Sequence, residues 1–177
     1  GGASTGSKRP AALFGADDRG SAAHFDRAHG CRLTTVDGRE LVDCTMALGA
    51  VALGHGDAAV VRAVHDAALH GNVSGLSPRL EVDLAERLRD RIPCAERVRF
   101  LKTGAEGVAA AVRIARAATG RNTVVCCGYF GWLDWAAAGP GVPPAARADV
   151  IDVPYDDAPA LREAVARAGS DLAAVVL

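Results

Sequence analysis

The stretch RVRFLKTGAEG, residues 97–107, decides the fold of this chain. Its first five residues largely alternate apolar and charged side chains, which predicts a strand over 97–101. A glycine-containing turn follows, and an Ala- and Val-rich pattern then predicts a helix near 105–118, with Val108 and Val112 on one face. The first-turn amides of a helix lack partners and lie at the positive end of its dipole. The turn is therefore a candidate phosphate site, although many such joints bind no ligand.

A second informative segment is GYFGWLDW, residues 128–135, which follows a strand predicted near 123–127. Four aromatic side chains lie between residues 129 and 135, although aromatic residues make up only 5% of the chain. One interpretation is a hydrophobic plug that closes the sheet. The other is a stacking surface for a flat ring whose phosphate lies on the preceding loop. Pyridoxal phosphate has both the ring and the phosphate, so it fits the two loops together.

The order and spacing of several motifs resemble the N-terminal half of a class III, fold-type-I pyridoxal-phosphate aminotransferase. Within that family, the glutamate-1-semialdehyde aminomutase-like branch is the most similar. The motifs that carry this resemblance lie at residues 1–5, 35–43, 48–49, 53–55, 93–100, 111–117, 119–121 and 128–132. The resemblance implies an α/β fold, in which the large domain is a mainly parallel sheet with helices on both faces. An N-terminal arm and β-hairpin of the small domain precede it.

The resemblance also implies a cofactor site in this segment. Its residues are Thr103, Gly104 and Ala105 around the phosphate, with Tyr129 and Phe130 beside the ring. The family usually has Ser or Thr at the position of Ala105 and His at the position of Phe130. The first change removes a hydroxyl donor, which Thr103 could replace. Both changes favour a specialised relative over the housekeeping aminomutase.

Family members hold the cofactor as a Schiff base on a lysine and pair its pyridine nitrogen with an aspartate, both far downstream of the motifs matched here. The chain has two lysines, Lys8 and Lys102, and neither corresponds to that position. We therefore expect no catalytic residue in this segment and no activity from it alone. The apolar run at 171–177 also leads us to expect further sequence that covers it.

Composition is consistent with a cytoplasmic α/β enzyme. The net charge of −1 and the scattered arginines give no reason to expect nucleic acid. No apolar stretch is long enough for a transmembrane helix. The five cysteines do not have the spacing of a zinc site, so no metal is expected.

The pattern along the chain predicts two parts. Residues 1–56 form an arm, irregular over 1–22, and a hairpin near 25–45 that turns at Asp37-Gly38. Residues 57–177 form the first part of the cofactor-binding large domain. Helices are predicted at 58–69, 79–91, 105–118 and 157–168, and strands at 97–101, 123–127, 148–153 and 171–177. This alternation predicts parallel strands, whose carboxyl-end loops would share one crevice.

Two further residues have less distinct signals. Arg79, at a predicted helix start, is a weak candidate for binding an anionic substrate, and a solvated arginine is the alternative. His55, in Leu-Gly-His-Gly, is expected to cap or orient the following helix rather than to act in catalysis.

Three functions stay open. The first is an aminotransferase that moves an amino group between an amino donor and a carbonyl, such as an amino-sugar aldehyde or another secondary metabolite. The second is an aminomutase or epimerase that uses the same cofactor within one substrate. The third is a non-catalytic binding fragment. The resemblance further implies a homodimer in which a loop of the neighbouring subunit completes the phosphate site.

Overall fold

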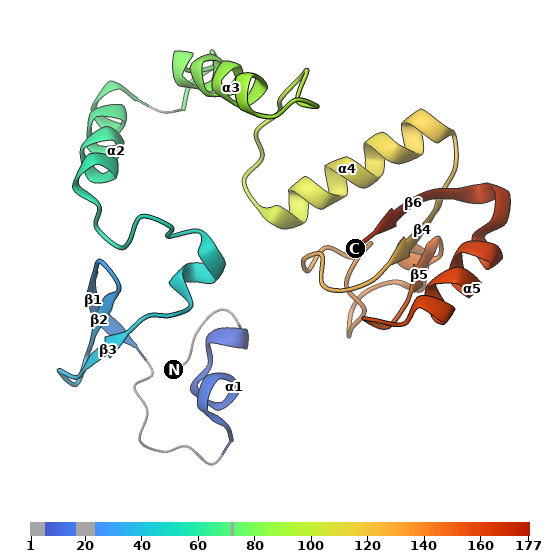
Figure 1. Cartoon of the computed structure of the whole chain (residues 1–177), viewed down its shortest axis with the longest axis horizontal. Coiled ribbons are helices and arrows are strands. Elements are labelled where there is room, and N and C mark those ends of the chain that lie inside the picture. Colours follow the sequence, from blue (N-terminus) through green and yellow to red (C-terminus); the bar gives the residue numbers. More distant parts are fainter. Residues whose placement is uncertain (1–5, 17–23, 72) are drawn as a thin grey trace. The chain divides into compact units, whose positions relative to one another are not determined.

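The structure is a computed structural model, and it describes residues 6–16, 24–71 and 73–177 (Figure 1). The motif at residues 1–5 and part of the predicted arm, residues 17–22, lie outside the described residues. The chain divides into two compact units, Gly1–Arg79 and Leu80–Leu177. The functional division between residues 56 and 57 stays a prediction.

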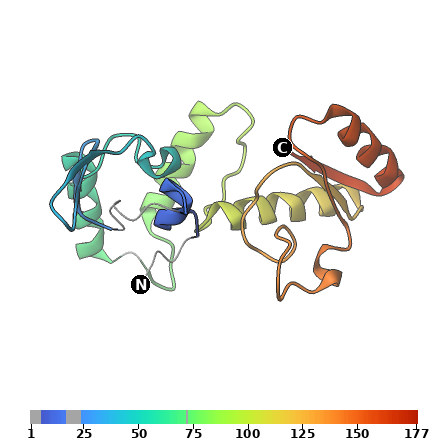
Figure 2. The same cartoon turned by 90° about the horizontal axis from the view of Figure 1, so that it is seen from below.

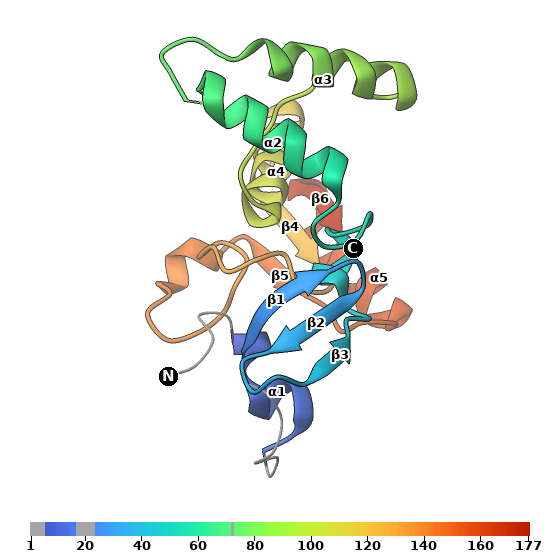
Figure 3. The ribbon, with the colours of Figure 1, turned by 90° about the vertical axis from the view of Figure 1, so that its left-hand side faces the viewer.

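The first unit contains an antiparallel sheet of three strands in the order β1-β2-β3 (Figure 3). The predicted hairpin is confirmed by β2 and β3, which pair across the Asp37-Gly38 turn, where Gly38 has a φ of 84°. Strand β1 adds a partner on the other side of β2. The expectation of an irregular arm is wrong for part of its length, because a proline at the first helical position favours a short helix, α1. The bounds are α1 Pro10–Phe14, β1 Phe25–His29, β2 Arg32–Thr35 and β3 Glu40–Val42.

Two helices confirm the predictions for 58–69 and 79–91. They are α2, Ala58–His70, in the first unit, and α3, Arg79–Arg91, which begins at the boundary. The side chain of Asp57 accepts hydrogen bonds from the amides of Ala59 and Val60, so Asp57 caps α2. Neither helix contains a buried residue.

The second unit is built on a parallel sheet in the order β5-β4-β6. Side chains alternate between the faces of β4: Val124 and Cys126 pack with Val112 of α4, while Val125 packs with Ala164 of α5. The two helices therefore cover opposite faces of the sheet (Figure 1 and Figure 2). The bounds are α4 Gly104–Thr119, β4 Thr123–Cys126, β5 Val150–Asp152, α5 Ala158–Ala168 and β6 Leu172–Val176. The predicted parallel α/β fold with helices on both faces is confirmed.

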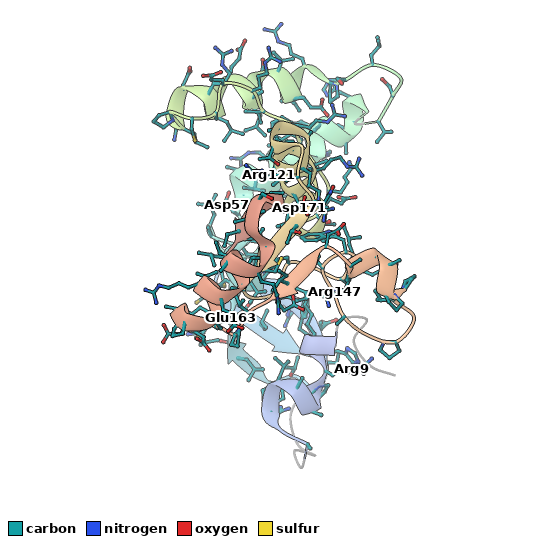
Figure 4. The ribbon with its side chains drawn as sticks, turned by 90° about the vertical axis from the view of Figure 1, so that its right-hand side faces the viewer. Arg9, Asp57, Arg121, Arg147, Glu163 and Asp171 are labelled. Carbon is teal, nitrogen blue, oxygen red and sulfur yellow. The ribbon has the colours of Figure 1, made fainter. Side chains whose placement is uncertain are left out.

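Asp171 ties the edge of this sheet to the end of α4. Its carboxylate accepts a hydrogen bond from the Thr123 hydroxyl at 2.7 Å and from the amide of Asn122 at 3.1 Å. Arg121 lies beside it and donates to the carbonyl oxygen of Leu172 (Figure 4). The hydrogen bond from Thr123, as the largest cause, and that from the Asn122 amide lower the pKa of Asp171.

The strand expected at 97–101 is wrong. Residues 98–101 have no regular structure, and within the described parts of the chain their backbone joins no sheet. Alternating side chains specify which face a strand would bury, but a strand forms only when its amides and carbonyls find a neighbour. Phe100 and Leu101 accordingly stay exposed.

Candidate cofactor-binding site

The start of α4 is organised by a reciprocal cap between Thr103 and Glu106. The Thr103 hydroxyl accepts a hydrogen bond from the Glu106 amide at 3.2 Å. In return, Oε2 of Glu106 accepts from the amides of Thr103 at 2.9 Å and Lys102 at 3.0 Å. This capping box follows from the spacing of Thr and Glu three residues apart, and it explains why the helix begins at Gly104.

The cap leaves two amide donors for a ligand. The amide of Gly107 donates to the carbonyl oxygen of Thr103, and that of Glu106 is used in the cap. In the part of the chain that the structure describes, the amides of Gly104 and Ala105 have no hydrogen-bond partner. They lie in the first turn of a helix of 16 residues, where the dipole favours negative charge. This arrangement is suited to an anion such as a phosphate group.

The Thr103 hydroxyl is less available to a bound phosphate than the sequence suggests. The hydroxyl lies 3.3 Å from Oε2 of Glu106 and donates to it, besides accepting from the Glu106 amide. A phosphate would have to compete with a carboxylate for that proton. The hydroxyl missing at Ala105 is therefore not replaced by a free hydroxyl at Thr103.

The loop after β4 contains exposed aromatic residues, as a stacking surface requires, and packed ones, as a hydrophobic plug requires. Tyr129 is 83% exposed and Trp132 is 75% exposed, so their rings are free to bind a ligand. Phe130 and Trp135 instead pack against the core around Val112, as a hydrophobic plug would. The indole nitrogen of Trp135 is buried and has no hydrogen-bond partner in the described structure. The role of Phe130 beside a cofactor stays a prediction.

The two loops meet at Ala105 and Gly131. A Cβ built on Gly131 would lie 2.3 Å from the Cβ of Ala105 and 2.9 Å from its Cα, so only glycine fits there. Gly131 also has a φ of 101°, which side-chain-bearing residues rarely adopt. Through this contact, the aromatic loop lies against the helix turn that holds the free amides of Gly104 and Ala105. Sequence reasoning missed it, because a glycine two residues after Tyr129 reads as an ordinary turn residue.

The remaining predicted residue, Arg79, is the first residue of α3 and is exposed. Its contact with a substrate stays a prediction. Lys102 is exposed as well, and it contributes its backbone amide to the cap of α4.

His55 does not cap the helix that follows it, because Asp57 does. Its Nε2 atom lies 2.9 Å from Oδ2 of Asp43, and its backbone pairs with Gly30 through two hydrogen bonds. Asp43 also accepts from the amides of Thr45 and Met46 at 2.9 Å. The hydrogen bond with His55 is the largest cause that lowers the pKa of Asp43. His55 therefore fixes the loop before α2 to the antiparallel sheet.

The fold is a parallel α/β domain in which an aromatic loop lies against the start of a helix with two free amides, and comparisons with known proteins identify its family. The family model for aminotransferase class III matches residues 15–135. The chain belongs to the class-III aminotransferase family.

Individual relatives include more than one activity. Glutamate-1-semialdehyde 2,1-aminomutase of Chloroflexus aggregans is 38% identical over 175 residues, which cover 89% of this chain and 40% of that protein. The 2'-deamino-2'-hydroxyneamine transaminase of Streptomyces kanamyceticus is 41% identical over 154 residues, which cover 85% of this chain and 39% of that protein. A transaminase structure with PLP bound superposes with a TM-score of 0.80 at 29% identity, covering 90% of this chain and 41% of that one.

The chain thus spans about 40% of the length of the relatives it matches. The family and the PLP-bound structure support the predicted cofactor, pyridoxal phosphate. The two free amides and the exposed Tyr129 ring fit that group's phosphate and ring. No helix in the described ranges is long and apolar enough to cross a bilayer. A cytoplasmic location stays a prediction.

Proposed function

We propose that the intact protein is a pyridoxal-phosphate-dependent aminotransferase that moves an amino group between an amino donor and a carbonyl substrate. The observation that carries this proposal is the pair of free amides of Gly104 and Ala105 at the start of α4, in a class-III chain. The loop that holds Tyr129 touches the same helix turn. These features suit one ligand that has both an anionic group and a flat ring.

In this proposal each residue has a defined task. The amides of Gly104 and Ala105 donate to the phosphate, and the Tyr129 ring lies against the cofactor ring. The Glu106 carboxylate stabilises the helix turn by accepting hydrogen bonds from the amides of Lys102 and Thr103. The bound cofactor supplies an electron sink for the carbon that bears the amine. The resemblance also requires a Schiff-base lysine and an aspartate at the pyridine nitrogen, and neither Lys8 nor Lys102 corresponds to that lysine.

The relatives support two related activities. The 41% identical transaminase favours transfer of the amine to a second molecule, with an amino sugar or another secondary metabolite as the proposed carbonyl substrate. The 38% identical aminomutase favours the alternative, in which the amine moves within one substrate. We rank transamination first, partly because it is the commoner activity in the family. Ala105 and Phe130 also depart from the residues usual in the family, which favours a specialised relative over the housekeeping aminomutase.

The experiment is an assay of the purified intact protein with pyridoxal phosphate. Amino donors and carbonyl acceptors are incubated together and separately, and the products are identified by mass spectrometry. Transamination predicts one keto product for each amine formed, and only when both substrates are present. An aminomutase would convert a single amino aldehyde into its isomer without a separate acceptor. Failure of the protein to bind pyridoxal phosphate would favour the non-catalytic binding reading and contradict both activities.

A further inference from the structure

The contact between Gly131 and Ala105 joins two segments that are 26 positions apart in the sequence (131 − 105). One segment, the first turn of α4, holds the free amides of Gly104 and Ala105. The other is the loop that presents Tyr129. At this point the two backbones approach so closely that no Cβ fits on Gly131. The approach therefore depends on a glycine at position 131 of the loop.

This contact determines how far the amide donors lie from the tyrosine ring. Phe130 anchors the loop to the core from one side by packing near Val112. Gly131 rests on the helix from the other side. Interiors are packed densely, so an added methyl group is accommodated only by moving one segment. Any such movement would separate the phosphate-binding turn from the stacking ring.

We propose that Gly131 is a positioning residue for the cofactor, which acts by seating the Tyr129 loop directly on Ala105. The inference rests on the proposed function, since it concerns the same cofactor. It also places the Cβ of Ala105 directly against the loop backbone.

The chain offers a matched control for the decisive variant, Gly131→Ala. Gly128 belongs to the same loop and also has a positive φ, 120°. A Cβ at Gly128 would lie 3.8 Å from Cζ of Phe130, which is ordinary contact. Both Gly→Ala changes therefore impose an unfavourable backbone conformation, but only the change at Gly131 forces the loop away from Ala105.

The experiment measures the dissociation constant of pyridoxal phosphate for the intact protein by absorbance titration. Circular dichroism in the absorption band of the bound cofactor reports the orientation of its ring, and the melting temperature of the cofactor-free protein reports folding. We expect Gly131→Ala to weaken binding by about tenfold or more relative to Gly128→Ala. We also expect it to change the cofactor's circular dichroism, which reports the orientation of the ring in the fraction of protein that stays folded, whatever the melting temperature.

The double variant Ala105→Gly/Gly131→Ala separates positioning from general damage. Removing the Ala105 Cβ relieves the 2.3 Å approach and leaves the 2.9 Å approach to Cα, so we expect partial recovery of affinity relative to Gly131→Ala. Ala105→Gly alone completes the cycle. Equal affinities for the Gly131 and Gly128 variants, or no recovery in the double variant, would overturn the inference while leaving the proposed function intact. If the unaltered protein does not bind the cofactor, both fail.

Discussion

At the scale of single residues, Tyr129 is the ring whose role can be tested most directly, because it is 83% exposed and supports no core packing. Tyr129→Ala is expected to weaken pyridoxal phosphate binding by on the order of 1 kcal/mol, since an aromatic pair is worth about 0.5–1.5 kcal/mol beyond burial. Titration of the intact protein measures this. Tyr129→Phe keeps the ring and serves as the control. A cofactor-bound structure with its ring more than about 6 Å from Tyr129 would refute the stacking.

Ala105 provides the second test at this scale. The Thr103 hydroxyl already donates to Glu106, so the proposed phosphate site lacks a free side-chain hydroxyl at residues 103–105. Ala105→Ser is expected to tighten pyridoxal phosphate by up to about 1.5 kcal/mol, the net worth of an ordinary hydrogen bond. The dissociation constant is the measurement, with Ala105→Gly as the comparison that adds no donor. Weaker binding of the serine variant would mean that another donor already fills the place.

At the scale of elements, the caps of α4 and α5 can be compared. The Thr103 hydroxyl caps α4, and the carboxylate of Asp157 caps α5 by accepting from the Ala160 amide at 2.9 Å. Loss of either cap, by Thr103→Ala or Asp157→Ala, is expected to lower the free energy of unfolding by about 1 kcal/mol. Only Thr103→Ala is expected to change cofactor affinity as well, because the proposed phosphate site lies at the start of α4 and not at that of α5. Equal affinities for both variants would argue against a phosphate at this turn.

The link between Asp43 and His55 predicts a pH dependence. The folded-state pKa of Asp43 is lowered, chiefly by its hydrogen bond with His55, so the folded protein binds fewer protons than the unfolded chain near the ordinary carboxyl pKa of about 3.9. The stabilisation is therefore complete above that pKa and is lost as pH falls through the lower, folded value.

Asp43→Asn tests this link. We expect it to lower the free energy of unfolding by about 1.5–3 kcal/mol at pH 7, the range for a hydrogen bond to a charged group. The difference from the unaltered protein should shrink as pH falls below about 4. Urea denaturation across this pH range provides the measurement, and the exposed Asp26 of β1 supplies a control, Asp26→Asn. A difference that stays constant with pH would contradict the role of the Asp43 charge.

At the scale of the whole molecule, we propose a homodimer. Apolar side chains of α2 and α3 are exposed although both helices are regular, among them Val60, Val64, Leu80 and Val82. An exposed apolar face on either helix favours an interaction surface there, and two-fold dimers are the commonest assembly. Light scattering during size exclusion is expected to give a dimer for the intact protein and aggregates for residues 1–177 alone. A well-behaved monomer of residues 1–177 would favour an independent binding module.

The pattern of apolar residues was enough to predict most helices and strands. Val108 and Val112 predicted one buried face of α4, and the apolar runs at β4 and β6 predicted a parallel sheet. The strand predicted at 97–101 does not form. Its alternating pattern indicates which face a strand would bury, but it does not show whether a neighbouring strand is there to pair with. The free amides of Gly104 and Ala105 could be predicted from the Gly turn and helix start. The sequence could not show whether the Thr103 hydroxyl donates to Glu106 or to a ligand, and the structure shows that it donates to Glu106.

The sequence by itself therefore determined the family and the parallel α/β fold, and it located the turn that we propose for the phosphate, because these depend on periodicity and on motifs that are local in the chain. Tertiary structure alone decided which aromatic rings are buried and which are exposed, and that Gly131 rests on Ala105. Such contacts depend on how far two segments approach after the sheet has folded between them. The spacing of residues along the chain does not indicate how closely two such segments approach each other.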